Sequence, residues 1–326
     1  MSPRTPSRTQ KRDPVAALAS VRSEVEKAVV GQDPIVFGLL AALVVRGHVI
    51  LEGVPGVAKT LLAKALAHSI ELPFRRIQFT PDLMPSDVTG NVVYEADTKS
   101  FRFRPGPIFA SIVLADELNR TPPKTQAALL EAMEERQVSI EGEQHRLPEP
   151  FLVIATQNPI EYEGTYPLPE AQLDRFLLKL RVGYPDAAAE RRVLQMHHEG
   201  KDPHDLDSLG LRRVATAGDL AAATQAMTGL TVAEEIFDYV LALAAETRRS
   251  PSLALGVSPR GSAMLLEAAK AWAWLANRDF VTPDDIKALL KPAWRHRLLL
   301  RPEVELEGAS VDRVLDGIAE RVPVPK

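Results

Sequence analysis

The sequence predicts an α/β protein with a parallel sheet in its first half and a smaller helical domain in its second. Two observations lead to this fold class. From Val15 to Tyr184, short apolar runs alternate with segments of helical periodicity, and after Pro185 only the helical periodicity continues. Continuous apolar strands with helices between them are typical of a parallel sheet that helices cover on both faces, an αβα sandwich. A chain of 326 residues is long enough for about two domains.

Three apolar runs are the predicted strands: Val49–Leu51, Ile112–Leu114 and Phe151–Ala155. The segment Lys59–Ile70 places leucine and alanine on one stripe and therefore predicts a helix. The longest apolar run, Ile35–Val45, is too short to cross a bilayer, so it predicts a buried helix.

Two stretches with period-two alternation predict β-hairpins inserted in this framework, at residues 91–104 and 137–147. In the first, Arg102 and Arg104 alternate with phenylalanines. We interpret it as a half-buried strand with solvated arginines. A ribbon that faces nucleic acid is the alternative.

The second half carries helix-start signals. Thr231–Glu234 has the form of a capping box, and Thr282–Asp285 combines an N-cap residue with a first-turn proline and acidic residues. We therefore predict a flexible tail at residues 1–13, an α/β core at 14–185 and a helical domain at 186–326.

Composition excludes several function classes. The chain has 39 Lys and Arg against 43 Asp and Glu, and a net charge of −4 gives no overall field for nucleic acid or anionic membrane. Cysteine is absent, which excludes disulfides, thiolate metal sites and cysteine nucleophiles. The basic N-terminal residues precede no apolar signal core, so we expect a cytoplasmic protein that does not insert into membranes.

A glycine-containing loop follows the first predicted strand and opens a helix: Gly53-Val54-Pro55-Gly56-Val57-Ala58-Lys59-Thr60. It differs from the P-loop pattern only in that Ala58 replaces the last glycine. The backbone N–H groups of such a loop converge on phosphate at the positive end of a helix. Lys59 would supply charge to the β- and γ-phosphates, and Thr60 would bind Mg²⁺ through its hydroxyl. If Ala58 needs a positive φ, the strain is about 1–2 kcal/mol. The alternative is a chance glycine turn.

The second and third strands also end in polar residues, Asp116-Glu117 and Gln157-Asn158. Asp116 would hold Mg²⁺, usually through water, while Glu117 would orient the attacking water or accept its proton. The Asn158 amide could hydrogen-bond the γ-phosphate or the water. Taken alone, acids at a strand end and Asn before Pro are ordinary turn signals.

Two arginines stand in distinctive contexts, Arg175 in Leu173–Phe176 and Arg260 in Val257–Gly261. By itself, each is an ordinary surface or ion-pairing residue. In phosphoryl transfer, an added guanidinium contributes about 10³–10⁵ in rate.

Together these elements resemble the AAA+ ATPases, specifically the MoxR branch, which is related to magnesium-chelatase ATPase subunits. The similar strings run in family order from residue 51 to residue 260: LEGVPGVAKT, QFTPDLMPSDVTG, FRPGPIF, LADELNR, ATQNP, YPLPEAQLDRF and SPR. The resemblance implies a P-loop core with hairpin inserts, followed by a helical lid.

The resemblance also implies a role for each site residue. Lys59 and Thr60 become the phosphate and Mg²⁺ residues, Asp116 the metal-site acid and Glu117 the catalytic acid. The remaining roles are the adenine contact at Val30-Gly31-Gln32, the first sensor at Asn158, the finger given to a neighbouring subunit at Arg175, the second sensor on the lid at Arg260, and a further interface arginine at Arg120.

The implied activity is Mg²⁺-dependent ATP hydrolysis at the subunit interfaces of a ring, a hexamer by our prediction. The implied role is chaperone-like: remodelling or maturation of a client protein complex, sometimes with metal-cofactor insertion, together with a separate partner that carries a von Willebrand factor A domain. We see no cluster of metal ligands, and we interpret His197 and His198 as solvated.

Two other functions compete with this one. A nucleic-acid-directed AAA+ motor or DNA-bound regulator is the alternative, which the net charge of −4 and the absence of a recognisable helix-turn-helix string disfavour, so we do not expect nucleic acid as a partner. A non-catalytic scaffold would need neither Glu117 nor Arg175.

Overall fold

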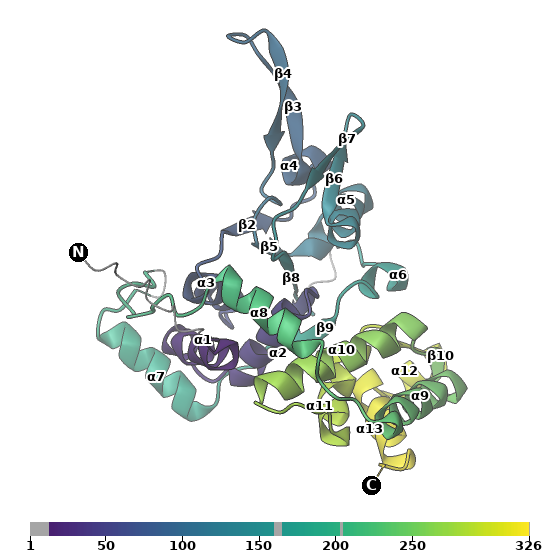
Figure 1. Ribbon diagram of the computed structural model, residues 1–326. Coiled ribbons are helices and arrows are strands. Elements are labelled where there is room, and N and C mark those ends of the chain that lie inside the picture. The colour runs from purple at the N-terminus through teal and green to yellow at the C-terminus, as the bar shows by residue number, and fades with distance from the viewer. Residues whose placement is uncertain (1–12, 160–164, 203–204, 326) are drawn as a thin grey trace, which may run out of the picture.

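A computed structural model describes residues 13–159, 165–202 and 205–325 (Figure 1). One parallel sheet is formed by five strands: β1 (Val49–Glu52), β2 (Phe74–Gln78), β5 (Ile112–Asp116), β8 (Leu152–Gln157) and β9 (Leu178–Arg181). Their order is β2-β5-β8-β1-β9, and each neighbouring pair is parallel. The predicted α/β fold is confirmed. The sequence pattern did not single out β2 and β9; β2 exposes two arginines, which hid its strand character.

Helices cover both faces of the sheet. One layer consists of α1 (Pro14–Ala28), α2 (Asp33–Val44) and α3 (Lys59–Ser69), and the other is formed by α5 (Pro123–Glu135). Within β1, Leu51 is buried against the first layer and Ile50 against the second. Because successive strand residues point to opposite faces, a strand covered on both sides must be apolar throughout. The buried helix predicted at Ile35–Val45 is confirmed as α2.

Two antiparallel hairpins project from the sheet, as predicted (Figure 1). They consist of β3 (Gly90–Glu95) with β4 (Ser100–Pro105), which follow the short helix α4 (Pro85–Thr89), and of β6 (Gln137–Ile140) with β7 (Glu143–Arg146). Near the base, Phe103 of the first hairpin stacks on His145 of the second, with ring centroids 3.9 Å apart. Further out, Tyr94 and Phe101 contact each other and are largely exposed.

The rest of the described chain is mainly helical. Its elements are the single turns η1 (Leu118–Arg120) and α6 (Glu170–Leu173), the helices α7 (Ala187–His198), α8 (Ala217–Met227), α9 (Glu234–Arg249), α10 (Pro259–Leu275), α11 (Pro283–Trp294), α12 (Pro302–Leu306) and α13 (Val311–Arg321), and the antiparallel pair β10 (Leu253–Leu255) and β11 (Leu299–Leu300). The helix α8 packs on α1 and α2. The helix α10 packs on α2, where Phe37 and Trp272 meet edge to face. This contact joins the helical domain to the first layer in one hydrophobic cluster.

One predicted helix start is wrong. The helix α9 begins at Glu234 with Ala233 as its N-cap residue, so Thr231 does not cap it. The backbone of Thr231 pairs instead with Asp279 and Val281, which holds the residue extended ahead of the helix. The N-cap predicted at Thr282 is confirmed, and it also forms a capping box with Asp285. Within the described residues, no helix is both long and apolar enough to span a membrane.

Candidate active site

The loop between β1 and α3, which the sequence predicts to bind phosphate, has constrained backbone positions. A Cβ on Gly53 would lie 2.5 Å from the carbonyl oxygen of Val182, so this position requires glycine. Gly56 has φ +85°. Ala58 is the N-cap residue of α3 at φ 61°, in the left-handed region, so it carries the strain considered above, about 1–2 kcal/mol. The side chain of Lys59 turns back toward this loop and donates to the carbonyl oxygens of Gly53 and Val54.

The end of β5 presents two carboxylates in different surroundings. Asp116 is 8% exposed; its Oδ1 accepts from the Thr156 hydroxyl at 2.6 Å and its Oδ2 accepts from Arg76 at 2.7 Å. Glu117 has φ 58°, and its N–H donates to the same Thr156 hydroxyl at 2.9 Å. The hydroxyl of Thr156 on β8 therefore ties the two acidic residues to the neighbouring strand.

The Glu117 carboxylate is held outside the sheet by two donors. Gln78 Nε2 at the end of β2 lies 2.7 Å from Glu117 Oε2, and Arg120 Nη1 lies 2.8 Å from the same oxygen. Arg120, considered above as an interface arginine, thus contacts Glu117 within its own chain. Sequence reasoning missed Gln78, Arg76 and Thr156, because only strand pairing brings them to the acids.

The predicted phosphate and metal residues gather at one edge of the sheet, which we call the carboxyl edge. Gly53, Glu117 and Asn158 directly follow the ends of β1, β5 and β8. Since β8 lies between β1 and β5, and neighbouring strands are about 4.8 Å apart, the loop and the acids face each other across about 10 Å. Thr60 belongs to the first turn of α3 at this edge.

Magnesium suits the side chains at the carboxyl edge. Mg²⁺ takes oxygen ligands, often one or two carboxylates with waters and substrate phosphates. The Thr60 hydroxyl and the Asp116 carboxylate are such donors, and Asp116 is already oriented by Thr156. In the portion of the chain that the structure describes, no three His, Cys, Asp or Glu side chains form a metal-binding group by themselves.

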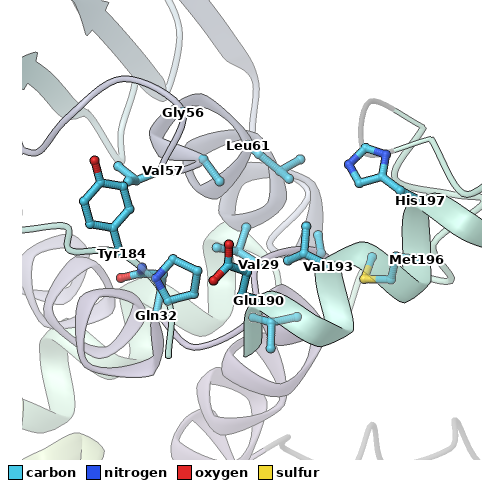
Figure 2. A pocket seen from close by; sticks show the side chains of 14 residues that line it. Val29, Gln32, Gly56, Val57, Leu61, Tyr184, Glu190, Val193, Met196 and His197 are labelled. Atoms are coloured by element: carbon cyan, nitrogen blue, oxygen red, sulfur yellow. The ribbon is translucent and has the colours of Figure 1, made fainter. Parts of the chain in front are cut away.

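A pocket of about 400 Å³ adjoins the loop (Figure 2). It is lined by Val29, Val30 and Gln32 from the turn between α1 and α2, Gly56, Val57 and Ala58 from the loop, Leu61 of α3, Tyr184 and Pro185 after β9, and Glu190, Val193, Met196 and His197 from α7. Gln32 donates to the carbonyl oxygen of Gly183 at 3.0 Å. Gly31 has φ +79°, and a Cβ there would lie 2.9 Å from Ala189 Cβ, so glycine lets the turn and α7 approach.

Sequence reasoning missed the contribution of α7 to this pocket. Figure 2 shows Tyr184 and His197 on opposite sides of the pocket in that view, with Glu190 between them. His197 is exposed, as predicted, yet it lines the pocket. The signal was the spacing of Glu190, Val193 and His197, whose successive steps of three and four residues place them on one helix face.

The two singled-out arginines lie together at the opposite edge, which we call the amino edge. Arg260 donates twice to Glu134 of α5, at 3.1 and 2.7 Å, and Arg175 Nε lies 3.9 Å from the same carboxylate. They line a pocket of about 270 Å³ with Gly47 and His48, which directly precede β1. Hydrogen bonds from Arg260 hold the pKa of the Glu134 carboxyl below its ordinary value. The loop that follows β1 therefore lies at the carboxyl end of this strand, and the two arginines lie near its amino end.

Comparison with known proteins agrees with this architecture. Residues 48–178 match the ATPase family associated with various cellular activities (AAA), and residues 245–318 match the AAA lid domain. The chain is 48% identical to YeaC of Bacillus subtilis, over 94% of this chain and 95% of that protein. It is 41% identical to the chaperone MoxR1 of Mycobacterium tuberculosis, over 93% of this chain and 81% of that protein.

A solved structure shows the same arrangement. The crystal structure of a protein from Cytophaga hutchinsonii superposes with a TM-score of 0.88 at 38% identity, over 96% of both chains.

The fold and the two matched domains define an AAA ATPase, a protein that binds and hydrolyses ATP. Within this class, the identity to MoxR1 over most of both chains shows that the chain belongs to the MoxR-type family.

Proposed function

We propose that the chain hydrolyses ATP with Mg²⁺ at the interfaces of a ring, a hexamer by our expectation. One observation carries this proposal: Arg175 and Arg260 lie at the amino edge, while the phosphate loop lies at the carboxyl edge of the same strand. A chain cannot bring both edges to one nucleotide, but two neighbouring subunits can. AAA proteins typically assemble as oligomers, which is consistent with a shared site.

At the carboxyl edge, the first subunit would bind the triphosphate. Loop N–H groups and Lys59 would hold the phosphates, with Lys59 exchanging its carbonyl partners for phosphate oxygens. Thr60 and Asp116 would hold the metal, Asp116 through water. Mg²⁺ held there would supply positive charge that neutralises the negative charge of the phosphates.

The proposed water-activating groups are Glu117 and Asn158. Glu117 would orient the attacking water and accept its proton. Its carboxylate is partly exposed, so a water can bind to it. Gln78 and Arg120 hold that carboxylate in place, so they would set where the water is bound. Asn158 would donate its amide to the γ-phosphate or the water.

The pocket beside the loop would take the adenosine. Val30, next to Gly31, and the aliphatic lining suit an aromatic base, and Tyr184, Glu190 and His197 offer polar groups for base edges or ribose hydroxyls. Its position next to Gly56–Ala58 is where a nucleoside would lie once its phosphates occupy the loop.

The second subunit would supply Arg175 and Arg260 to the transferring phosphoryl group. Both guanidiniums would stabilise charge that spreads over the oxygens of that group, and Arg175, as the arginine finger, would contribute about 10³–10⁵ in rate. Each would leave Glu134 for a more highly charged partner. Hydrolysis in one subunit would thereby depend on its neighbour.

Mixed rings test the shared site. We expect Arg175→Ala to bind ATP, as measured by calorimetry with magnesium, and to lose turnover. Lys59→Ala should not bind ATP. Mixing the two should restore part of the turnover, because interfaces form between an intact loop and an intact arginine. Arg213→Ala, at an exposed ion pair with Glu71, is the control. Wild-type turnover by Arg175→Ala would refute the shared site.

We further propose a chaperone-like role, because the relative MoxR1 bears that name. The client would be a protein complex that the ATPase remodels or matures, sometimes with insertion of a metal cofactor, and the partner a separate von Willebrand factor A domain protein. Glu117→Gln should trap the ATP-bound ring with its client, so a pull-down with that variant would identify it.

A nucleic-acid motor is the competing function. The first hairpin supports it weakly, since Phe101, Arg102 and Arg104 are all exposed. We expect DNA to leave the ATPase rate unchanged at every salt concentration. A steep, salt-sensitive stimulation would favour the motor.

A further inference from the structure

Arg297 follows α11 in the helical domain, and its side chain is only 1% exposed. Its Nε donates to Asp174 Oδ1 at 2.7 Å. Its two terminal nitrogens donate to the backbone carbonyls of Asp174, Phe176 and Leu177. One buried guanidinium therefore holds the backbone on both sides of Arg175.

The same side chain packs against the start of α10, which carries Arg260. A Cβ on Gly261 would lie 2.8 Å from Arg297 Cδ, so glycine permits this approach. Ser258, the N-cap residue of α10, donates from Oγ to Asp174 Oδ2 at 3.0 Å and accepts from Gly261 N–H at 3.0 Å. The loop that carries Arg175 and the helix start that carries Arg260 thus form one hydrogen-bonded unit.

We propose that Arg297 is a positioning residue for Arg175 and Arg260, which it links so that one subunit presents both guanidiniums to its neighbour as a rigid pair. This inference rests on the proposed shared site. It assigns a catalytic consequence to a side chain that is buried and reaches no nucleotide. It also makes the helical domain, which contributes Arg297, Ser258 and Arg260, part of the arginine machinery.

Position 297 requires the planar, several-donor geometry of a guanidinium. Lysine would keep a positive charge beside Asp174 but has a compact ammonium on a flexible stem, so it cannot reach the three carbonyls and the carboxylate at once. The Arg175 loop would then be free to move relative to α10. Misplacement of a reacting group by about 1 Å can cost about 100-fold in rate.

The main experiment compares Arg297→Lys with Arg278→Lys. Arg278 makes a two-pronged ion pair with Asp285 inside the helical domain, so it is a matched control for the loss of a guanidinium. For Arg297→Lys we expect kcat to fall about 10- to 100-fold with the Kd for ATP unchanged, since the nucleotide lies at the other edge. Arg278→Lys should retain wild-type kcat.

Mixed rings separate positioning from a general structural defect. Lys59→Ala subunits carry intact arginines but no working loop, so they should restore turnover to the loops of Arg297→Lys subunits. A subunit with a damaged nucleotide site of its own would not be rescued. Unchanged kcat in Arg297→Lys, or a loss of kcat that the mixture does not restore, would overturn the proposal.

A milder variant covers the case in which Arg297→Lys does not fold. Ser258→Ala removes the bond between the α10 start and Asp174, and Ser310→Ala removes a comparable N-cap hydroxyl from α13. Ser258→Ala should lower kcat several-fold with rescue by Lys59→Ala subunits, and Ser310→Ala should not; equal kcat in the two would contradict the proposal. A different result would refute the shared site itself, namely wild-type turnover in Arg175→Ala.

Discussion

The two edges of the sheet are built in different ways. At the carboxyl edge, each functional residue lies at the end of a strand or shortly after it, so the backbone alone brings Lys59, Asp116 and Asn158 together. At the amino edge, Arg175 and Arg260 meet only because the helical domain packs on the core and Glu134 and Arg297 hold them. The first edge depends on local structure and the second on the contact between domains. Changes in domain packing should therefore alter the arginines before they alter nucleotide binding.

A large effect should come from the carboxyl edge. Glu117→Gln keeps the shape of the side chain and removes the base, so kcat should fall about 10²–10⁴-fold. Binding of ATP should persist, because the loop and Lys59 are untouched. Single-turnover hydrolysis and calorimetry measure the two quantities. Glu131→Gln, on the outward face of α5, is the control. If kcat is retained, the edge binds nucleotide without Glu117 acting in the reaction.

Arg260→Ala should have the next largest effect, a loss of about 10²–10³ in kcat, similar to the loss of one preorganised charge donor. If Arg260 acts on the neighbour, Lys59→Ala subunits should rescue it as they rescue Arg175→Ala. Arg301→Ala, an exposed arginine elsewhere in the helical domain, should behave as wild type. If the mixture is not rescued, Arg260 acts on the nucleotide of its own subunit, and the two edges do not have the separate roles proposed here.

The same contrast explains what the sequence could predict. The strands β1, β5 and β8 are apolar runs that end in functional residues, so both the fold and the carboxyl edge could be read from local pattern. Gln78 could not, because β2 exposes polar residues and pairs with β5 only in the folded protein.

Arg297 and Glu134 look like ordinary charges in the sequence. Their roles depend on contacts between residues far apart in the sequence. Arg297 contacts Asp174 over a separation of 123 residues, and Glu134 contacts Arg260 over 126 residues. The spacing of the pocket residues on α7 predicted one helix face. It did not predict that this face lines the pocket, which depends on how α7 packs beside the turn at Gly31.

Acid should weaken the amino edge through His48. Its Nδ1 accepts from Val153 N–H at 3.0 Å, so the ring is neutral, and burial lowers its pKa from 6.5 to about 4. The unfolded chain therefore takes up a proton below about pH 6.5 that the folded chain refuses until about pH 4. The contribution of neutral His48 to the free energy of unfolding is fully present above pH 6.5 and is lost as the pH falls toward 4.

At pH 5, the loss from His48 should be about 2 kcal/mol. Urea unfolding at pH 7 and pH 5 measures it. The free energy of unfolding should decrease less in His48→Gln than in the wild type, by about that amount. His198→Gln, exposed on α7, should follow the wild type. An equal pH dependence in all three proteins would show that His48 is not held neutral.

The smallest effect should come from the phosphate loop. Because Ala58 adopts φ 61°, Ala58→Gly should relieve about 1–2 kcal/mol of strain, and the greater freedom of glycine in the unfolded chain returns about 0.5–1 kcal/mol of that. The net gain in unfolding free energy should be about 0.5–1 kcal/mol. Ala222→Gly, exposed within α8, should instead lose about 1 kcal/mol, as glycine does in a helix. A loss of stability in Ala58→Gly would mean that this edge, too, depends on more than its local backbone.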